Sequence, residues 1–251
     1  MFAAKVPFWT QAAAGGGFGN SVFLPSSGGQ FLSKSSVSQL ITWKNTGGFT
    51  IEYWMYMTAF PNSINPGFGN QDGGGTNYWS FGPITSGALE FYHWAPGTNY
   101  FTTNTGVLTL NTWHAVAAVF TSSGSNTTAS MYIDGTRVNI RLNNAGAFAS
   151  TASTTAGVYS TGTVFGGGTY GAVRLSGYID NMRVSNVDRY SGASYTVATT
   201  GFTLDSNTYL LIPPVEANGA TSIAFQSTGG NGTMTNASNL ITVSSSRANH
   251  T

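Results

Sequence analysis

Short runs of β-branched, aromatic and other apolar residues recur along this chain, and clusters of Gly, Asn, Ser and Pro separate them. Such punctuation is typical of strands joined by turns. Helical spacing of apolar residues extends at best over a turn or two, around residues 37–41. The pattern therefore predicts an all-β fold, a sandwich or a barrel. The runs expected as strands are 21–24, 49–57, 77–81, 88–93, 113–120, 130–133, 158–165, 177–184 and 208–212.

The run 49–57 alternates with the period of a strand, so its side chains divide between two faces. One face is apolar and is expected to point into the core; it carries Phe49, Ile51, Tyr53, Met55 and Met57. The other face mixes aromatic and polar side chains, which suits an outer or partly covered surface; it carries Thr50, Glu52, Trp54, Tyr56 and Thr58. The run 113–120 is apolar on both faces apart from His114, as expected for a central strand. Further on, Asp134-Gly135 between two strand-like runs predicts a tight hairpin.

The two ends differ from the middle of the chain. Residues 1–19 form a Gly- and Ala-rich leader without a period, and Pro213-Pro214 ends the last strong strand run. We expect an N-terminal arm over 1–19, a sandwich over 20–212, and a C-terminal arm or edge-strand extension over 213–251. The apolar residues of the arms are the expected anchors on another chain; they include Phe2, Phe8, Trp9, Phe225 and Ile241. The alternative for the tail is that it adds a strand to the chain's own sheet.

Composition narrows the functions open to this chain of 251 residues. Charged residues make up 7% and the net charge is +1, which gives no electrostatic basis for binding nucleic acid or an anionic membrane. A charge near zero also does little to prevent self-association, so we expect a homo-oligomer. Cysteine is absent, which excludes disulfides and thiolate metal sites. The opening residues lack the pattern of a signal peptide, and no apolar window is long enough to span a membrane.

Catalytic patterns are weak. A glycosidase needs two carboxylates placed across the scissile bond, but the position two residues after Glu52 is Trp54, and two after Glu90 is Tyr92. The two glutamates could pair only across strands. No Gly-x-Ser-x-Gly elbow and no phosphate-binding loop occur, and the three histidines show no metal-ligand spacing. We therefore expect a protein that is not an enzyme and requires no cofactor.

The densest candidate binding surface is aromatic, with neutral amide neighbours. Such rings suit stacking on sugars and equally suit protein interfaces. Alternate strand positions must face inward, so core packing is expected to claim about half of the rings. The candidates are Trp54, Tyr56, Tyr78, Trp79, Tyr92, Trp94 and Tyr100.

The order of several motifs resembles laminin-G-like domains of the concanavalin A-like class. In sequence order they are residues 48–56 (GFTIEYWMY), 111–119 (NTWHAVAAV), 131–135 (MYIDG) and 177–184 (GYIDNMRV). The resemblance implies a jelly-roll sandwich of two antiparallel sheets. It also implies a possible calcium ion at Asp180, which matches an acidic position of the last motif. The alternative is that Asp180 hydrogen-bonds the backbone of the N-terminal strand, and we favour this alternative.

The segments 183–190 (RVSNVDRY) and 205–211 (DSNTYLL) are similar to a subset of these domains found in bacteriophage virion proteins. This similarity implies a non-enzymatic virion structural protein, a capsid decoration or fibre component. Such a protein would be assembled in the host cytoplasm, be exposed on the particle surface, and contact other virion proteins or symmetry mates through its arms. The alternative is an adhesin module that binds a host surface glycan, and a glycoside hydrolase ranks third.

Overall fold

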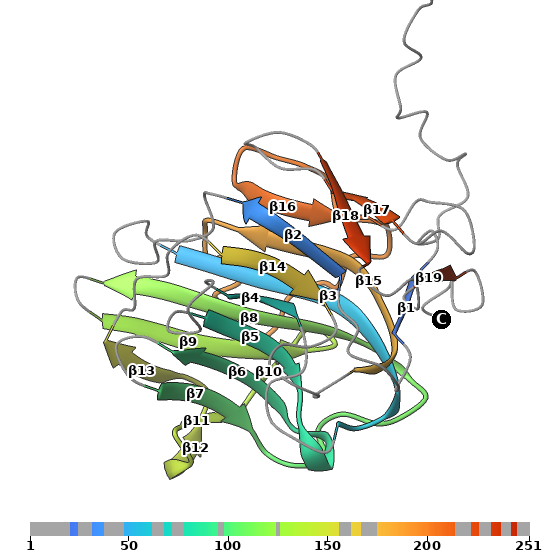
Figure 1. The fold of residues 1–251 in the computed structure, drawn as a ribbon. Coiled ribbons are helices and arrows are strands. Elements are labelled where there is room, and N and C mark those ends of the chain that lie inside the picture. Colours follow the sequence, from blue (N-terminus) through green and yellow to red (C-terminus); the bar gives the residue numbers. More distant parts are fainter. Residues whose placement is uncertain are drawn as a thin grey trace, which may run out of the picture.

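The computed structural model describes most of the central chain and parts of the tail. The described residues are 21–24, 32–37, 48–61, 68–71, 78–94, 98–123, 126–155, 162–166, 175–213, 222–225, 232–236 and 242–244. They form two sheets, stacked face to face, in which all neighbouring strands are antiparallel (Figure 1). The predicted two-sheet sandwich is confirmed.

Sheet A has the strand order β10-β9-β8-β3-β15-β1-β19, with β13 paired to β9 and β16 paired to β15. Its strands are β1 (Ser21–Leu24), β3 (Gly48–Ala59), β8 (Trp113–Ser123), β9 (Asn126–Ile133), β10 (Thr136–Val138), β13 (Ala152–Thr155), β15 (Ser176–Ser185), β16 (Thr208–Ile212) and β19 (Thr242–Ser244). The long central strands β3, β8 and β15 correspond to the runs with the strongest strand signal in the sequence.

Sheet B has the order β12-β11-β7-β6-β5-β4-β14-β2-β18-β17. Its strands are β2 (Leu32–Val37), β4 (Phe68–Gln71), β5 (Tyr78–Pro83), β6 (Leu89–Trp94), β7 (Thr98–Thr103), β11 (Ile140–Leu142), β12 (Ala145–Ala149), β14 (Gly162–Gly166), β17 (Ser222–Phe225) and β18 (Gly232–Asn236). The described helical structure is one short 3-10 turn, η1 (Thr85–Gly87). Of the residues 37–41 considered for a helical turn, residue 37 ends strand β2, and residues 38–41 lie outside the described part.

The alternation predicted for β3 is confirmed. Its five apolar residues, Phe49, Ile51, Tyr53, Met55 and Met57, are all buried in the main core between the sheets. They pack with apolar residues of sheet B, including Phe81, Phe91 and Phe101. Since each of these sheet B residues points inward, its neighbours along the strand point to the outer face of sheet B.

Two tight hairpins are set by residues in the left-handed region. Asp134 (φ 50°) and Gly135 (φ 76°) connect β9 to β10, with Ile133 opposite Thr136, as the Asp-Gly pair predicts. A Cβ on Gly135 would lie 2.4 Å from the carbonyl oxygen of Tyr195, so only glycine fits there. In the β11–β12 hairpin, Asn143 (φ 50°) and Asn144 (φ 54°) occupy the equivalent positions.

The tail contributes strands to both sheets of its own chain. β18 pairs with β2 and with β17, while β19 pairs with β1. This arrangement corresponds to the alternative in which the tail covers the edges of the sandwich. Phe225 is in β17, but its side chain, together with Phe2, Phe8, Trp9 and Ile241, lies outside the described residues, so their expected docking stays a prediction.

Candidate functional site

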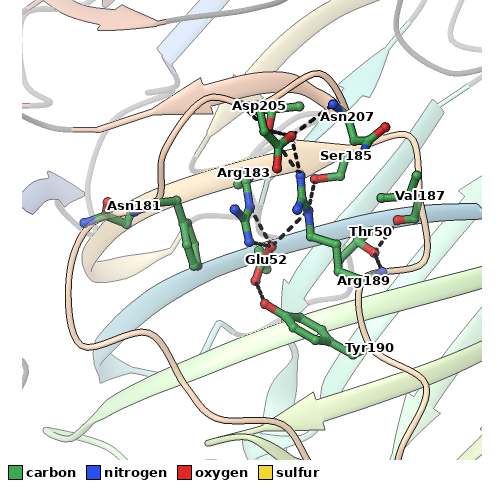
Figure 2. A network of polar contacts seen from close by, with 12 residues as sticks. Thr50, Glu52, Asn181, Arg183, Ser185, Val187, Arg189, Tyr190, Asp205 and Asn207 are labelled. Atoms are coloured by element: carbon green, nitrogen blue, oxygen red, sulfur yellow. Dashed lines mark hydrogen bonds and ion pairs between the residues drawn. The ribbon is translucent and has the colours of Figure 1, made fainter.

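Glu52 lies on the outer face of sheet A in a network of polar contacts (Figure 2). It is 1% exposed, and the Nε and Nη2 of Arg183 approach its Oε1 to 2.8 and 2.7 Å. The hydroxyl of Tyr190 donates to its Oε2 at 2.5 Å. Both carboxylate oxygens are therefore engaged, and the network explains the glutamate as a structural residue rather than an acid or base.

Asp205 holds a second part of the same network. Its Oδ1 accepts hydrogen bonds from Arg189 Nη2 at 2.9 Å and from Thr208 Oγ1 at 2.7 Å. The bond from Arg189, together with that from Thr208, holds the pKa of the Asp205 carboxyl well below its usual range. Arg189 Nε also donates to Ser185 Oγ, and its backbone N–H donates to Thr50 Oγ1 at 3.0 Å.

These contacts tie the segment 186–207 to the outer face of sheet A (Figure 2). The rings of Tyr190 and Tyr195 in that segment stack with their centroids 3.7 Å apart. Both rings pack against a small apolar cluster of sheet A formed by Ala117, Val119 and Tyr132. Five residues of the segments 183–190 and 205–211 thus have a common role in this molecule, which is to anchor a covering segment. Those residues are Arg183, Arg189, Tyr190, Asp205 and Thr208.

The outer face of sheet B presents two rows of side chains across β6, β7 and β11. In one row the register places Glu90 opposite Thr102, which is opposite Arg141. In the other row Tyr92 is opposite Tyr100, and their rings are nearly parallel with centroids 6.4 Å apart. We call these five residues the sheet B face; Glu90, Tyr92 and Thr102 are buried, whereas Tyr100 and Arg141 are partly exposed.

Glu90 is the buried acid of the sheet B face. It is 5% exposed, and Thr102 Oγ1 donates to its Oε2 at 2.9 Å. Its Oε1 is buried and has no hydrogen-bond partner among the described residues. Burial raises the pKa of Glu90 to about 7, although the bond from Thr102 acts in the opposite direction. The group therefore changes charge close to neutral pH.

Arg141 is the cation of the sheet B face. Its guanidinium carbon lies 4.7 Å from the centre of the Phe148 ring, which holds the partly exposed side chain over β12. Its Nε is buried without a hydrogen-bond acceptor, and Arg141 forms no ion pair, within the part of the chain that the structure describes. The guanidinium therefore has unused hydrogen-bonding capacity.

Amide side chains border the Tyr100 side of the face. Asn143 Oδ1 accepts the backbone N–H of Tyr100 at 2.8 Å, and its Nδ2 donates to Asn99 Oδ1 at 3.0 Å. Asn144 Nδ2 donates to the Tyr100 hydroxyl at 3.2 Å. Asn143 and Asn144 are exposed and Tyr100 is half-buried, so these groups form a polar rim that solvent reaches. This rim was missed in the sequence, although the Asn-Asn pair at a turn position is its visible signal.

The aromatic residues predicted as one surface do not lie together. Trp54 and Tyr56 are on the outer face of sheet A, where Tyr56 is 5% exposed beneath Trp113 and Tyr178. Trp79 was wrongly assigned to a binding surface, because it is fully buried in the core between the sheets.

Two further aromatic candidates are placed by register alone. Tyr78 of β5 is opposite Trp94 of β6, while the side chains of both lie outside the described residues. Tyr92 and Tyr100 are the candidates that the described structure brings side by side.

Asp180, the candidate calcium ligand, is 1% exposed in β15. Its Oδ1 accepts hydrogen bonds from the backbone and side-chain amides of Asn181, at 2.6 and 3.0 Å. Burial raises its pKa well above the usual value, so the neutral form is favoured. No group of three His, Cys, Asp or Glu side chains suitable for a metal occurs in the described ranges. A hard cation needs several oxygen ligands, so this donor set does not fit calcium.

His114 connects β8 to two neighbouring segments. Its Nδ1 lies 2.8 Å from Asp134 Oδ2, and the backbone N–H of Thr109 donates to its Nε2 at 3.1 Å. Asp134 Oδ1 accepts the backbone N–H of Ala115 at 2.9 Å. Since Nε2 already accepts an amide hydrogen, it is poorly placed to activate the Thr109 hydroxyl 3.0 Å away. The arrangement stabilises the hairpin and the preceding loop, and it links two of the sequence motifs.

The two glutamates considered for glycoside hydrolysis lie on opposite sides of the molecule. Glu52 is on the outer face of sheet A and Glu90 on the outer face of sheet B. Two packed sheets lie about 10 Å apart, and each carboxylate projects away from the other. These residues therefore cannot form the acid pair that hydrolysis requires.

A model of the family described as the concanavalin A-like lectin/glucanases superfamily matches residues 26–191. No curated protein matches the chain. No helix in the described ranges has the length and apolar character needed to cross a membrane.

Several solved structures are similar to this chain. A putative carbohydrate-binding protein from Bacteroides ovatus is similar with a TM-score of 0.54 and 15% identity, covering 90% of this chain and 60% of that one. Mouse laminin α1 domains LG4-5 are similar with a TM-score of 0.47 and 12% identity, covering 74% of this chain and 47% of that one. The CBM40 of a Ruminococcus gnavus sialidase, bound to α2,3-sialyllactose, has a TM-score of 0.43 and 14% identity, covering 63% of this chain and 94% of that one. The chain thus spans less than two thirds of the first two structures.

Proposed function

We propose that this chain, which belongs to the concanavalin A-like lectin/glucanases superfamily, is a non-catalytic carbohydrate-binding module. The observation that carries the proposal is the sheet B face with its amide rim. The half-buried Tyr100 ring lies beside the side-chain amides of Asn143 and Asn144, and the buried Tyr92 ring is nearly parallel to it. A sugar offers an apolar ring face and a rim of hydroxyls, which match an aromatic surface bordered by amides.

The opposite side of the sandwich supports this choice of face. Segment 186–207 covers part of the outer face of sheet A, where its Tyr190 and Arg189 bond to Glu52 and Thr50 and its tyrosines pack on Ala117, Val119 and Tyr132. Glu90 and Glu52 are too far apart to cooperate in hydrolysis, which favours binding over catalysis. The carbohydrate-binding assignment of the similar Bacteroides protein is consistent with the proposal.

A glycan array with the full chain tests the proposal. Tyr100→Ala should weaken binding by about 1–3 kcal/mol, by analogy with bases stacked on aromatic side chains. Leu204→Ala is the matched control, because Leu204 is 43% exposed and lies in the segment that covers sheet A. Binding to no glycan, or equal affinity of the Tyr100→Ala and wild-type proteins, would contradict the assignment.

A second function is supported by a separate observation. The segments 183–190 and 205–211 resemble those of bacteriophage virion proteins, and we propose a decoration or fibre component exposed on the particle surface. A virion location and glycan binding are compatible, since an adhesin is carried on a particle. Immunogold labelling of virus particles from the source culture tests the location. Unlabelled particles would contradict the virion location, and glycan binding would then be the one function proposed.

A further inference from the structure

We propose that the sheet B face selects glycans that carry a carboxylate, that Arg141 binds this carboxylate, and that Glu90 makes the selection pH-dependent. The inference rests on the proposed carbohydrate-binding function and specifies its ligand class. It also assigns roles to two residues that the binding of a neutral sugar would not require.

Arg141 is suited to an anionic group. Its guanidinium is partly exposed and packs on Phe148, yet it has no counter-ion within the described residues. The other arginines of the described region that form ion pairs are engaged with Glu52 of sheet A or with Asp205 of segment 186–207. A planar guanidinium can bind a carboxylate through two parallel hydrogen bonds, which gives geometric selectivity as well as affinity.

Arg141 also lies beside the proposed sugar platform. It is opposite Thr102 in the register, and Tyr100 is two positions from Thr102 on the same face of β7. Strand spacing places the Cα atoms of such neighbours within about 5 to 8 Å. A pyranose ring on Tyr100 can therefore direct a ring carboxylate toward Arg141.

Glu90 is two strands from Arg141, with Thr102 between them, so their Cα atoms lie about 10 Å apart. The groups that face Glu90 on the neighbouring strands are Thr102 on β7 and Gly82 on β5, and both are uncharged. Arg141 on β11 is the charged side chain in its row. The charge of the face therefore depends on Glu90: it is positive when Glu90 is protonated and close to zero when Glu90 is ionised.

The direction of the pH effect follows from the burial of Glu90, which raises its pKa to about 7. Below that pH the carboxyl is neutral and does not repel an anionic ligand. Above it, the ionised carboxylate repels the ligand at a distance of about 8–10 Å. At an effective dielectric constant between those of protein and water, this repulsion weakens binding about three- to tenfold. Affinity for an acidic glycan should therefore fall as the pH rises through 7.

The test uses an array of matched triplets: a neutral oligosaccharide, its carboxylate-bearing derivative and its sulfated derivative, with the methyl ester of the acid as a further control. The wild-type chain should prefer the carboxylate form about tenfold over the ester. Arg141→Gln should abolish this preference, so that the acid and its methyl ester bind with equal affinity. Arg141→Lys should retain part of it, because the charge stays and the fork geometry is lost. Thermal unfolding of each variant checks that it is folded.

A titration from pH 5.5 to 8.5 tests the role of Glu90. Glu90→Gln should bind the acidic glycan with the same affinity throughout, and binding of the neutral sugar should not change with pH in either protein. Equal affinity for acid and ester, retained preference in Arg141→Gln, or stronger binding of the sulfated form would overturn the carboxylate assignment. Binding to no member of any triplet would contradict the proposed function itself, so the two failures can be distinguished.

Discussion

Glu90 provides a quantitative test of the structure through folding stability. In the folded chain burial raises its pKa from 4.5 to about 7, whereas in the unfolded chain it titrates near the ordinary value. Between these two pH values the folded state retains a proton that the unfolded state has lost. The favourable contribution is therefore complete below pH 4.5 and is lost as the pH rises through 7.

The size of the effect follows from the two pKa values. A difference of one pKa unit is worth about 1.4 kcal/mol, so the change from 4.5 to about 7 corresponds to about 3 kcal/mol. The wild-type chain should lose about this much of its free energy of unfolding between pH 4.5 and pH 9 through this residue. Glu90→Gln removes the titration but keeps the shape of the side chain and an acceptor for Thr102.

The assay is urea unfolding followed by tryptophan fluorescence at half-unit intervals from pH 4.5 to 9. Glu90→Gln should flatten the fall in stability and be more stable than the wild type above pH 7. Asp188→Asn is a matched control, because it removes an exposed acid and leaves Glu90 intact, so the wild-type slope should persist. A Glu90→Gln protein with the wild-type slope, or a wild type without one, would refute the reasoning.

Four further predictions address the fold and its assembly. Gly177→Ala should lower the free energy of unfolding, measured in urea, by about 2 kcal/mol or more, because the new Cβ would lie 1.9 Å from the carbonyl oxygen of Tyr56. Gly106→Ala is the control and should lower it distinctly less, because a Cβ there would have nothing within 4 Å. Arg183→Met should destabilise the chain by about 3–5 kcal/mol by leaving the buried Glu52 without its closest cation, and a near-neutral result would contradict that network. Deleting residues 213–251 should lower the melting temperature and promote aggregation, because it exposes the edges of β1 and β2. Deleting residues 1–19 should reduce the size of the oligomer measured by light scattering. An unchanged oligomer would contradict the docking of the leader on another chain.

The sequence by itself determined the class of fold and several of its details. The alternation along β3 identified its core face, and Asp134-Gly135 identified a hairpin, because both signals depend on residues next to one another in the chain. The ordered motifs identified the laminin-G-like sandwich for the same reason. They mark strands and turns, and a fixed series of strands leaves few ways to pair them.

Only the tertiary structure decided which of these residues can contact a ligand. Period-two alternation states that Tyr92 and Phe91 face opposite ways, but it does not state which side chains of an outer face stay exposed. On sheet A that depends on segment 186–207, whose Tyr190 binds Glu52, 138 positions earlier in the chain. The raised pKa of Glu90 has the same origin: it reflects burial in the folded sheet, which no local pattern of residues encodes.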